Sequence, residues 1–149
     1  MNNVSINEGY DLIKTTYLMI DDGDRRFLKQ FGVTPIQYFA LRWLDGTPGK
    51  TLSQLSRDLL CDPANVTRLT DRMEDKGLIA RQRYGQDRRV IWVALTPAGQ
   101  ELCSQIRQAH ADYTHCRMSV LSEAERATLH DLLNKLCNGL EGQLCLGSA

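Results

Sequence analysis

The residues with the most distinctive chemistry in this sequence are arginines that lie close together. Within nine residues the chain places a single acid, Asp87, among four arginines: Arg81, Arg83, Arg88 and Arg89. A guanidinium group is planar, stays charged and matches the oxygens of a phosphate, so this cluster favours binding to a polyanion. An exposed pair of strands could also use such arginines for charge pairs across the strands.

A second group of polar side chains precedes the arginines along the chain. Asp62-Pro63 is typical of a helix start, and the first turn of such a helix presents N–H groups and a positive dipole end that attract phosphate. Side chains that could hydrogen-bond to bases or phosphates follow at Asn65, Thr67, Arg68 and Thr70. Polar residues also cover ordinary solvated helices, so this helix alone fits both a nucleic-acid contact and a plain surface.

Catalytic and metal-binding patterns are missing from the sequence. It contains none of GxGxxG, GxxxxGK[ST], HExxH and GxSxG. His110 and His115 come nearest to a metal site, but side chains five residues apart on a helix point about 140° from each other. Joint ligation with Cys116 would need a break in that helix, so we predict no enzyme activity, no metal and no cofactor.

Composition is that of an ordinary single domain. The chain has 149 residues, of which 42% are hydrophobic, and its 18 lysines and arginines balance 18 aspartates and glutamates. A chain without net charge has no global field to hold a polyanion, so any such site must be local. The arginine cluster supplies a local site of this kind.

The N-terminus and the cysteines indicate the compartment. No stretch approaches the roughly 18 consecutive apolar residues of a membrane span, and residues 1–7 lack the basic and apolar segments of a secretion signal. The five cysteines are widely spaced without a CxxC pair, which favours reduced thiols over a disulfide framework or a zinc site. We expect a cytoplasmic protein with no membrane partner.

Hydrophobic spacing divides the chain into helices and one hairpin. The helical period, caps and prolines predict helices over residues 6–31, 36–44, 51–60, 63–76 and 97–120, and a last helix that begins with the capping box Ser122/Glu125. This last helix carries a stripe of leucines from Leu129 to Leu144. β-Branched and aromatic residues predict strands at residues 78–84 and 90–95 around a turn at residues 85–87.

The order of these elements predicts a mainly α fold of the α+β class in one domain, residues 1–149. A helix-turn-helix followed by a hairpin is the winged-helix arrangement, here residues 34–95, in which the helix from Pro63 would enter a major groove. Long helices at residues 6–31 and 100–145 carry apolar stripes that this small lobe cannot cover. We expect a second copy of the chain to cover them in a homodimer.

Sequence motifs support this interpretation. They are LSQL at residues 52–55, NVTRL at 65–69, DRMEDKGLIAR at 71–81, DRR at 87–89 and LTPAG at 95–99. In this order they resemble the motifs of the MarR family of winged-helix transcriptional regulators (multiple antibiotic resistance regulators). The resemblance implies a homodimer with interlocking terminal helices, whose two lobes bind a pseudo-palindromic operator in double-stranded DNA and usually repress the adjacent genes.

The resemblance also implies how the wing contacts DNA. In the family pattern, an acid two residues before an arginine orients that arginine into the minor groove, which here corresponds to Asp87 and Arg89. The candidate DNA contacts are Ser53, Gln54, Pro63, Asn65, Thr67, Arg68, Thr70, Arg83, Asp87, Arg88 and Arg89. A winged-helix module that binds other proteins is the main alternative, although such a face should be more apolar than this arginine cluster.

The resemblance also implies a way in which DNA binding could be switched. Family members commonly bind small aromatic or phenolic acids in a crevice beside the lobe, and by analogy the candidates for such a site are Tyr17, Tyr38, Phe39, Arg42 and Trp43. Aromatic residues at these spacings are also typical of a core. Other members sense oxidants through a cysteine in the first helix, where this chain has none.

Cys61 is the alternative candidate for redox sensing. It directly precedes Asp62-Pro63, and the positive end of the helix that begins there would favour the thiolate. A small buried hydrophobe is the simpler interpretation of such a cysteine.

Overall fold

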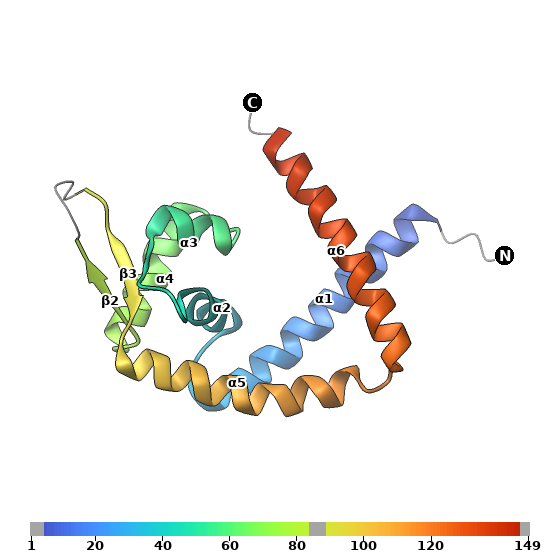
Figure 1. The fold of residues 1–149 in the computed structure, drawn as a ribbon, viewed down its shortest axis with the longest axis horizontal. Helices are drawn as coiled ribbons and strands as arrows, with labels where there is room; N and C mark the ends of the chain where they lie inside the picture. The colour runs from blue at the N-terminus through green and yellow to red at the C-terminus, as the bar shows by residue number, and fades with distance from the viewer. Residues whose placement is uncertain (1–4, 84–88, 147–149) are drawn as a thin grey trace. The chain divides into compact units, whose positions relative to one another are not determined.

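The structure is a computed structural model that describes residues 5–83 and 89–146. Its backbone forms two compact units, Met1–Arg107 and Gln108–Ala149. In chain order the elements are α1 (Ile6–Leu28), the short 3₁₀ helix η1 (Lys29–Phe31), α2 (Pro35–Leu44), β1 (Lys50–Thr51), α3 (Leu52–Asp58), α4 (Pro63–Asp75), β2 (Ile79–Gln82), β3 (Trp92–Leu95), α5 (Pro97–Met118) and α6 (Glu123–Leu146) (Figure 1). The mainly helical fold with a small sheet confirms the predicted fold class.

Side-chain caps define the starts of α2 and α3. Thr34 accepts a hydrogen bond from the backbone N–H of Gln37, whose side chain in turn accepts the N–H of Thr34. Thr51 and Gln54 form the same reciprocal pair. At α4, Pro63 occupies the first turn, where its missing N–H costs nothing. Because these signals are local, the starts predicted from the sequence for α2, α3 and α4 agree with the structure to within one residue.

Helix ends in the first unit differ more from the prediction. The helix predicted over residues 6–31 ends at Leu28 and continues as η1, and the helix predicted over residues 51–60 ends at Asp58. The turn after α3 places Leu60 in the left-handed region with φ 51°. The Leu60 N–H donates to Arg57 O at 3.2 Å, and the following N–H donates to Ser56 O at 3.1 Å. Gly77 makes the equivalent turn after α4 with φ 69°.

The strands form an antiparallel sheet in the order β1-β3-β2. In its register, Lys50 pairs with Val93, Thr51 with Trp92, and Arg81 with Val93. The predicted strands at 78–84 and 90–95 are shorter in the structure, and β1 was not predicted. Tyr84 and the predicted turn at residues 85–87 lie outside the described residues.

The core of the first unit lies between α2, α4, the sheet and the first turns of α5. Its fully buried side chains include Leu41, Leu44, Met73, Ile79, Val93 and Ile106. Gly99 allows α5 to approach closely, since a Cβ at this position would lie 2.0 Å from the carbonyl oxygen of Leu78. The start of α5 therefore rests on the turn that follows α4.

Polar contacts hold the turn after α4 against the start of α5 and hold the end of α4 against the turn before α2. The Thr96 hydroxyl donates to Gly77 O at 2.6 Å, and the Thr96 N–H donates to Leu78 O at 3.1 Å. Lys76 Nζ donates to Gly32 O at 2.6 Å, which joins the end of α4 to the turn before α2. The position of α4 is thus set from two sides.

The second unit contains the C-terminal part of α5 and the whole of α6. Ser122 and Glu125 form the predicted capping box, with the Glu125 N–H 3.3 Å from Ser122 Oγ and the Ser122 N–H 2.8 Å from Glu125 Oε2. On α6 the exposed leucines are Leu132, Leu133, Leu136 and Leu140. The side chains of Leu144 and Cys145, in its last turn, lie outside the described residues.

Every helix in the described ranges is too short or too polar to cross a lipid bilayer.

Candidate nucleic-acid interface

One face of α4 packs on the core. Val66, Thr70 and Met73 follow each other at spacings of four and three, and each is 0% exposed. The Thr70 hydroxyl donates to the carbonyl oxygens of Val66, at 3.0 Å, and Thr67, at 2.9 Å. The prediction that Thr70 contacts DNA is therefore corrected, because the fold encloses this side chain and uses its proton inside the helix.

Asn65 and Arg68 lie on an exposed side of α4. The Asn65 amide donates to the Asp62 carboxylate at 3.0 Å, and the Arg68 guanidinium donates to the Asn65 amide oxygen at 3.0 Å. Because Asp62 precedes the helix, this chain of bonds runs along its first turns. It holds both predicted contact residues in place at the surface.

A surface hollow of about 400 Å³ lies beside this part of α4. Its lining combines the start of α2 with α4 and the turn before it: Thr34, Ile36, Gln37, Cys61, Asn65, Arg68, Leu69 and Arg72. Arg68 and Arg72 make the hollow positive, and the N-terminal turn of α2 adds the positive end of its dipole. Cys61 is a partly exposed, reduced thiol at its edge.

Four more of the predicted contacts lie at the surface of α3 and α4. Pro63 and Thr67 are exposed, and the Thr67 hydroxyl donates to Pro63 O at 2.9 Å. Ser53 and Gln54 are exposed on the first turn of α3, where the Gln54 side chain is part of the helix cap. A Thr67 hydroxyl whose proton is engaged can still accept a hydrogen bond from a base or a water molecule.

Arg83, which follows β2, and Arg89, which precedes β3, are both exposed. Asp87 and Arg88 lie outside the described residues. The predicted orientation of Arg89 by Asp87 therefore stays a prediction.

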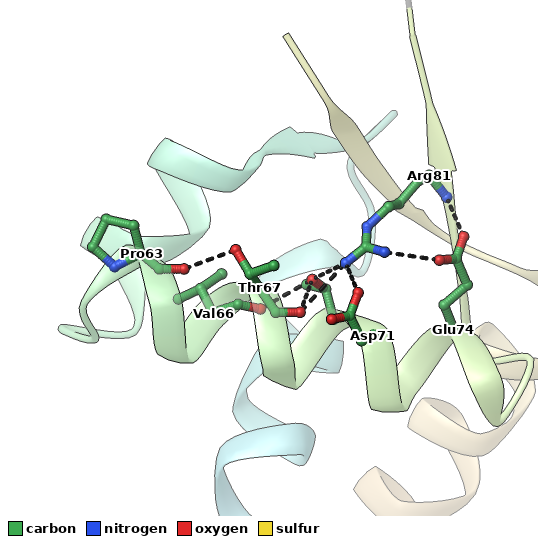
Figure 2. Close-up of polar contacts among 7 residues, drawn as sticks. Pro63, Val66, Thr67, Asp71, Glu74 and Arg81 are labelled. Atoms are coloured by element: carbon green, nitrogen blue, oxygen red, sulfur yellow. Dashed lines mark hydrogen bonds and ion pairs between the residues drawn. The ribbon is translucent and has the colours of Figure 1, made fainter. Parts of the chain in front are cut away.

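Arg81 differs from the other arginines of the cluster because it faces α4 (Figure 2). Its guanidinium lies 2.5 Å from Asp71 and 3.0 Å from Glu74, and only 24% of its side chain is exposed. Alternation along β2 places Arg81 on the same strand face as the buried Ile79. The expectation that it forms part of the charged surface of the wing is thus corrected.

The residues predicted for an aromatic ligand divide into buried and exposed groups. Tyr38 is a core residue, and burial raises the pKa of its hydroxyl, an effect that the nearby Arg42 opposes. Phe39 and Trp43 lie four residues apart on α2 and are each 46% exposed. Arg42 is also exposed, and its guanidinium carbon lies 5.9 Å from the centre of the Tyr38 ring. We call Phe39, Arg42 and Trp43 the α2 aromatic face. Tyr17 is exposed on α1.

The Cys103 thiol differs from that of Cys61 because it lies in the core. Cys103 is fully buried, and burial raises the pKa of its thiol, an effect that Asp45 reinforces. Within residues 5–83 and 89–146, no group of three or more His, Cys, Asp and Glu side chains could hold a metal ion.

Comparison with known sequences identifies relatives of this chain. Residues 33–91 match the profile of the MarR family. The HTH-type transcriptional repressor MdtR of Bacillus subtilis is 31% identical over 114 residues, which cover 76% of this chain and 74% of MdtR. A Thauera aromatica protein named for transcriptional regulation of the hcr operon is 34% identical over 105 residues. That match covers 70% of this chain and 63% of the Thauera protein, so it spans just under two thirds of that relative.

Solved structures extend the similarity to the fold. A Cys-to-Ser mutant of Escherichia coli MarR in complex with operator DNA has a TM-score of 0.80 to this chain at 29% identity. The match covers 88% of this chain and 94% of that one. Relatives named as transcriptional regulators agree with the prediction that the chain is not an enzyme. The predicted resemblance is confirmed, and the chain belongs to the MarR family of winged-helix, DNA-binding transcriptional regulators.

Proposed function

We propose that two copies of this chain bind a pseudo-palindromic DNA site as a repressor, with α4 in the major groove and the β2–β3 wing in the adjacent minor groove. The observation that carries the proposal is the concentration of exposed arginine on these elements in a chain without net charge. Arg68 and Arg72 lie on α4, Arg83 follows β2, and Arg89 precedes β3. Arginine suits both phosphates and the edges of bases.

The relatives support the partner and the direction of regulation. The Escherichia coli MarR mutant was solved in complex with operator DNA, and MdtR is named a repressor. The proposal includes a cytoplasmic location, since bacterial relatives of this kind meet their DNA there.

Exposed apolar stripes on α1 and on α6 support a homodimer. On α1 the side chains of Tyr10, Ile13, Tyr17 and Ile20 follow a helical spacing, and each is at least 43% exposed. The leucines of α6 described above form a second stripe. Monomers rarely leave stripes of this extent in water, and a second copy of the chain would cover them. Such a dimer would also present two α4 helices to two half-sites.

Selection from a random pool of double-stranded DNA tests this proposal. The recovered sequences should share a site with dyad symmetry, and binding to it should weaken steeply with salt as arginines release counterions from phosphates. A pool that yields no common site, or an affinity that does not change between low and moderate salt, would contradict the proposal.

We further propose that a small aromatic acid releases the DNA by binding at the α2 aromatic face. The exposed Arg42 guanidinium offers a carboxylate partner, and the exposed Phe39 and Trp43 rings on the same helix offer apolar walls. Such a ligand can act only by favouring a separation of the two lobes that does not fit successive major grooves.

A DNA-binding titration with salicylate tests the release. The acid should weaken DNA binding by the wild type and not by Arg42→Ala. Arg26→Ala is the matched control, because the exposed Arg26 side chain pairs with Asp22 within α1. Unchanged affinity of the wild type in salicylate would reject this ligand class.

Hydrogen peroxide provides a separate arm for Cys61. If this thiol is the switch instead, peroxide should release DNA from the wild type and not from Cys61→Ser. Release from both proteins would exclude Cys61.

A further inference from the structure

Arg81 joins the wing strand β2 to α4 through several bonds to one face of the helix (Figure 2). Its Nη2 lies 2.5 Å from Asp71 Oδ1, 2.7 Å from Thr70 Oγ1 and 3.3 Å from the carbonyl oxygen of Thr67. Its Nη1 lies 3.0 Å from Glu74 Oε2, and the Arg81 backbone N–H donates to Glu74 Oε1 at 3.2 Å. Both the backbone and the side chain of Arg81 are thus bound to α4.

The contacted residues are arranged to receive this arginine. Thr67, Thr70, Asp71 and Glu74 follow at spacings of three, one and three, which places them along one side of the helix. The Thr70 hydroxyl is fully buried, but it donates a hydrogen bond to a carbonyl oxygen of the helix and accepts one from Arg81. Neither its donor nor its acceptor side is left unsatisfied. A planar guanidinium can reach several such oxygens at once, whereas an ammonium group is a point charge.

The negative charges of Asp71 and Glu74 also bear on DNA binding by α4. The side chains of Asp71 and Glu74 are 51% and 40% exposed, respectively. Both lie on α4, the helix that enters the major groove in the proposed function. Unpaired carboxylates there would repel the phosphates of the backbone. Arg81 supplies a cation to both acids.

We propose that Arg81 is a positioning residue for DNA binding, which fixes the base of the wing against α4 and keeps the Asp71 and Glu74 carboxylates paired without itself contacting a phosphate. The inference rests on the proposed function, in which α4 and the wing contact DNA together. These elements must enter a major and a minor groove at the same time, so their relative orientation matters for affinity.

A double-mutant cycle on the DNA site recovered by selection tests the inference. Affinity is measured for the wild type, Arg81→Gln, the pair Asp71→Asn/Glu74→Gln, and the combination of all three changes. In the wild-type background, Arg81→Gln should weaken binding by about tenfold or more; in the background without the two carboxylates, it should cost less than about twofold. Equal losses in the two backgrounds would mean that Arg81 contacts DNA directly, and no loss in the wild-type background would also overturn the inference.

Two further measurements separate positioning from stability alone. In hydroxyl-radical footprints at saturating protein, Arg81→Gln should lose protection of the deoxyriboses that line the minor groove under the wing, while protection of the backbone on either side of α4 remains. Intact protection under the wing would overturn the positioning role. If Arg81→Gln does not fold, Arg81→Lys replaces it in the same cycle, since lysine keeps the charge but cannot bridge both carboxylates. Full affinity of a folded Arg81→Lys protein would then count against the inference.

Arg68→Ala distinguishes failure of this inference from failure of the proposed function. If Arg68→Ala and Arg89→Ala both keep wild-type affinity, the proposed DNA-contact surface is wrong. If they lose affinity and Arg81→Gln does not, only the positioning role fails.

Discussion

Arginines with the same charge have different roles in this chain because their guanidinium groups meet different partners. Arg81 binds the acids of α4, Arg68 lies at the surface against Asn65, and Arg107 pairs with Asp45 at the end of α2. Charge counting in the sequence located the arginine cluster at residues 81–89 but could not show that Arg81 binds the acids of α4 while Arg83 and Arg89 are exposed.

Part of the missing information was present in the residue spacing. Val66, Thr70 and Met73 repeat at helical spacing, so the apolar members of this set already indicated that Thr70 shares the core face. Arg81 lies two residues after Ile79, which places it on the inner face of a strand. Which acids it would meet could not be predicted, because that depends on how β2 packs against α4.

Leu60→Gly should stabilise the protein. Leu60 holds a left-handed backbone with φ 51°, and its side chain is 82% exposed, so little packing is lost on its removal. Relief of roughly 1–2 kcal/mol of strain should outweigh the entropy that glycine adds to the unfolded chain, roughly 0.5–1 kcal/mol. We expect the thermal midpoint to rise by about 2–4 °C at fixed protein concentration. Leu60→Ala, which retains the Cβ, is the control, and a midpoint for Leu60→Gly below that of Leu60→Ala would show that the strain is absent.

At the scale of elements, local signals located helix starts better than strands. Thr34, Thr51 and Pro63 mark the starts of α2, α3 and α4. Such signals can be recognised in the sequence because a helix cap involves only a few consecutive residues. β1 consists of Lys50–Thr51 and exists only through its pairing with β3, so no periodicity could indicate it. The winged-helix order was predictable, whereas the exact strand lengths depended on tertiary pairing.

The contact between α5 and the end of α4 predicts that Gly99→Ala is harmful. The added Cβ would collide with the backbone of Leu78, which cannot move aside as a flexible side chain would. We expect a loss of roughly 1–3 kcal/mol in the free energy of unfolding, measured by urea denaturation. Gly9→Ala is the matched control, because a Cβ at this position in α1 meets nothing within 4 Å. Equal stability of the two variants would contradict the close approach.

α4 and the wing should contribute differently to DNA binding. Arg68→Ala should relax the preference for particular bases in the major groove, because its side chain lies on the exposed face of α4. Arg89→Ala should weaken binding to every sequence, and most on sites whose A·T-rich minor groove is narrow. Affinities for a panel of single-base variants of the recovered site measure both effects. A uniform loss across the panel for both proteins would mean that neither side chain contacts a base.

At the scale of the whole molecule, we propose that a second copy of the chain covers the exposed stripes of α1 and α6. Replacing Leu136 and Leu140 with Lys should produce monomers or aggregates, because lysine charges in a dry interface are costly. Sedimentation should give about twice the chain mass for the wild type at micromolar concentration. Arg26→Ala, which alters an exposed ion pair, should remain a dimer. A wild-type monomer under these conditions would rule out the proposed assembly.

The central claim is that a dimer of this chain places two α4 helices and two wings on one DNA site. Hydroxyl-radical footprinting of the wild-type protein on the recovered site tests it most directly. The account predicts protection that repeats symmetrically about a dyad, with half-site centres roughly 10 bp apart and flanking minor-groove protection from the wings. A single protected segment without dyad symmetry, or weak protection spread evenly along the DNA, would contradict it.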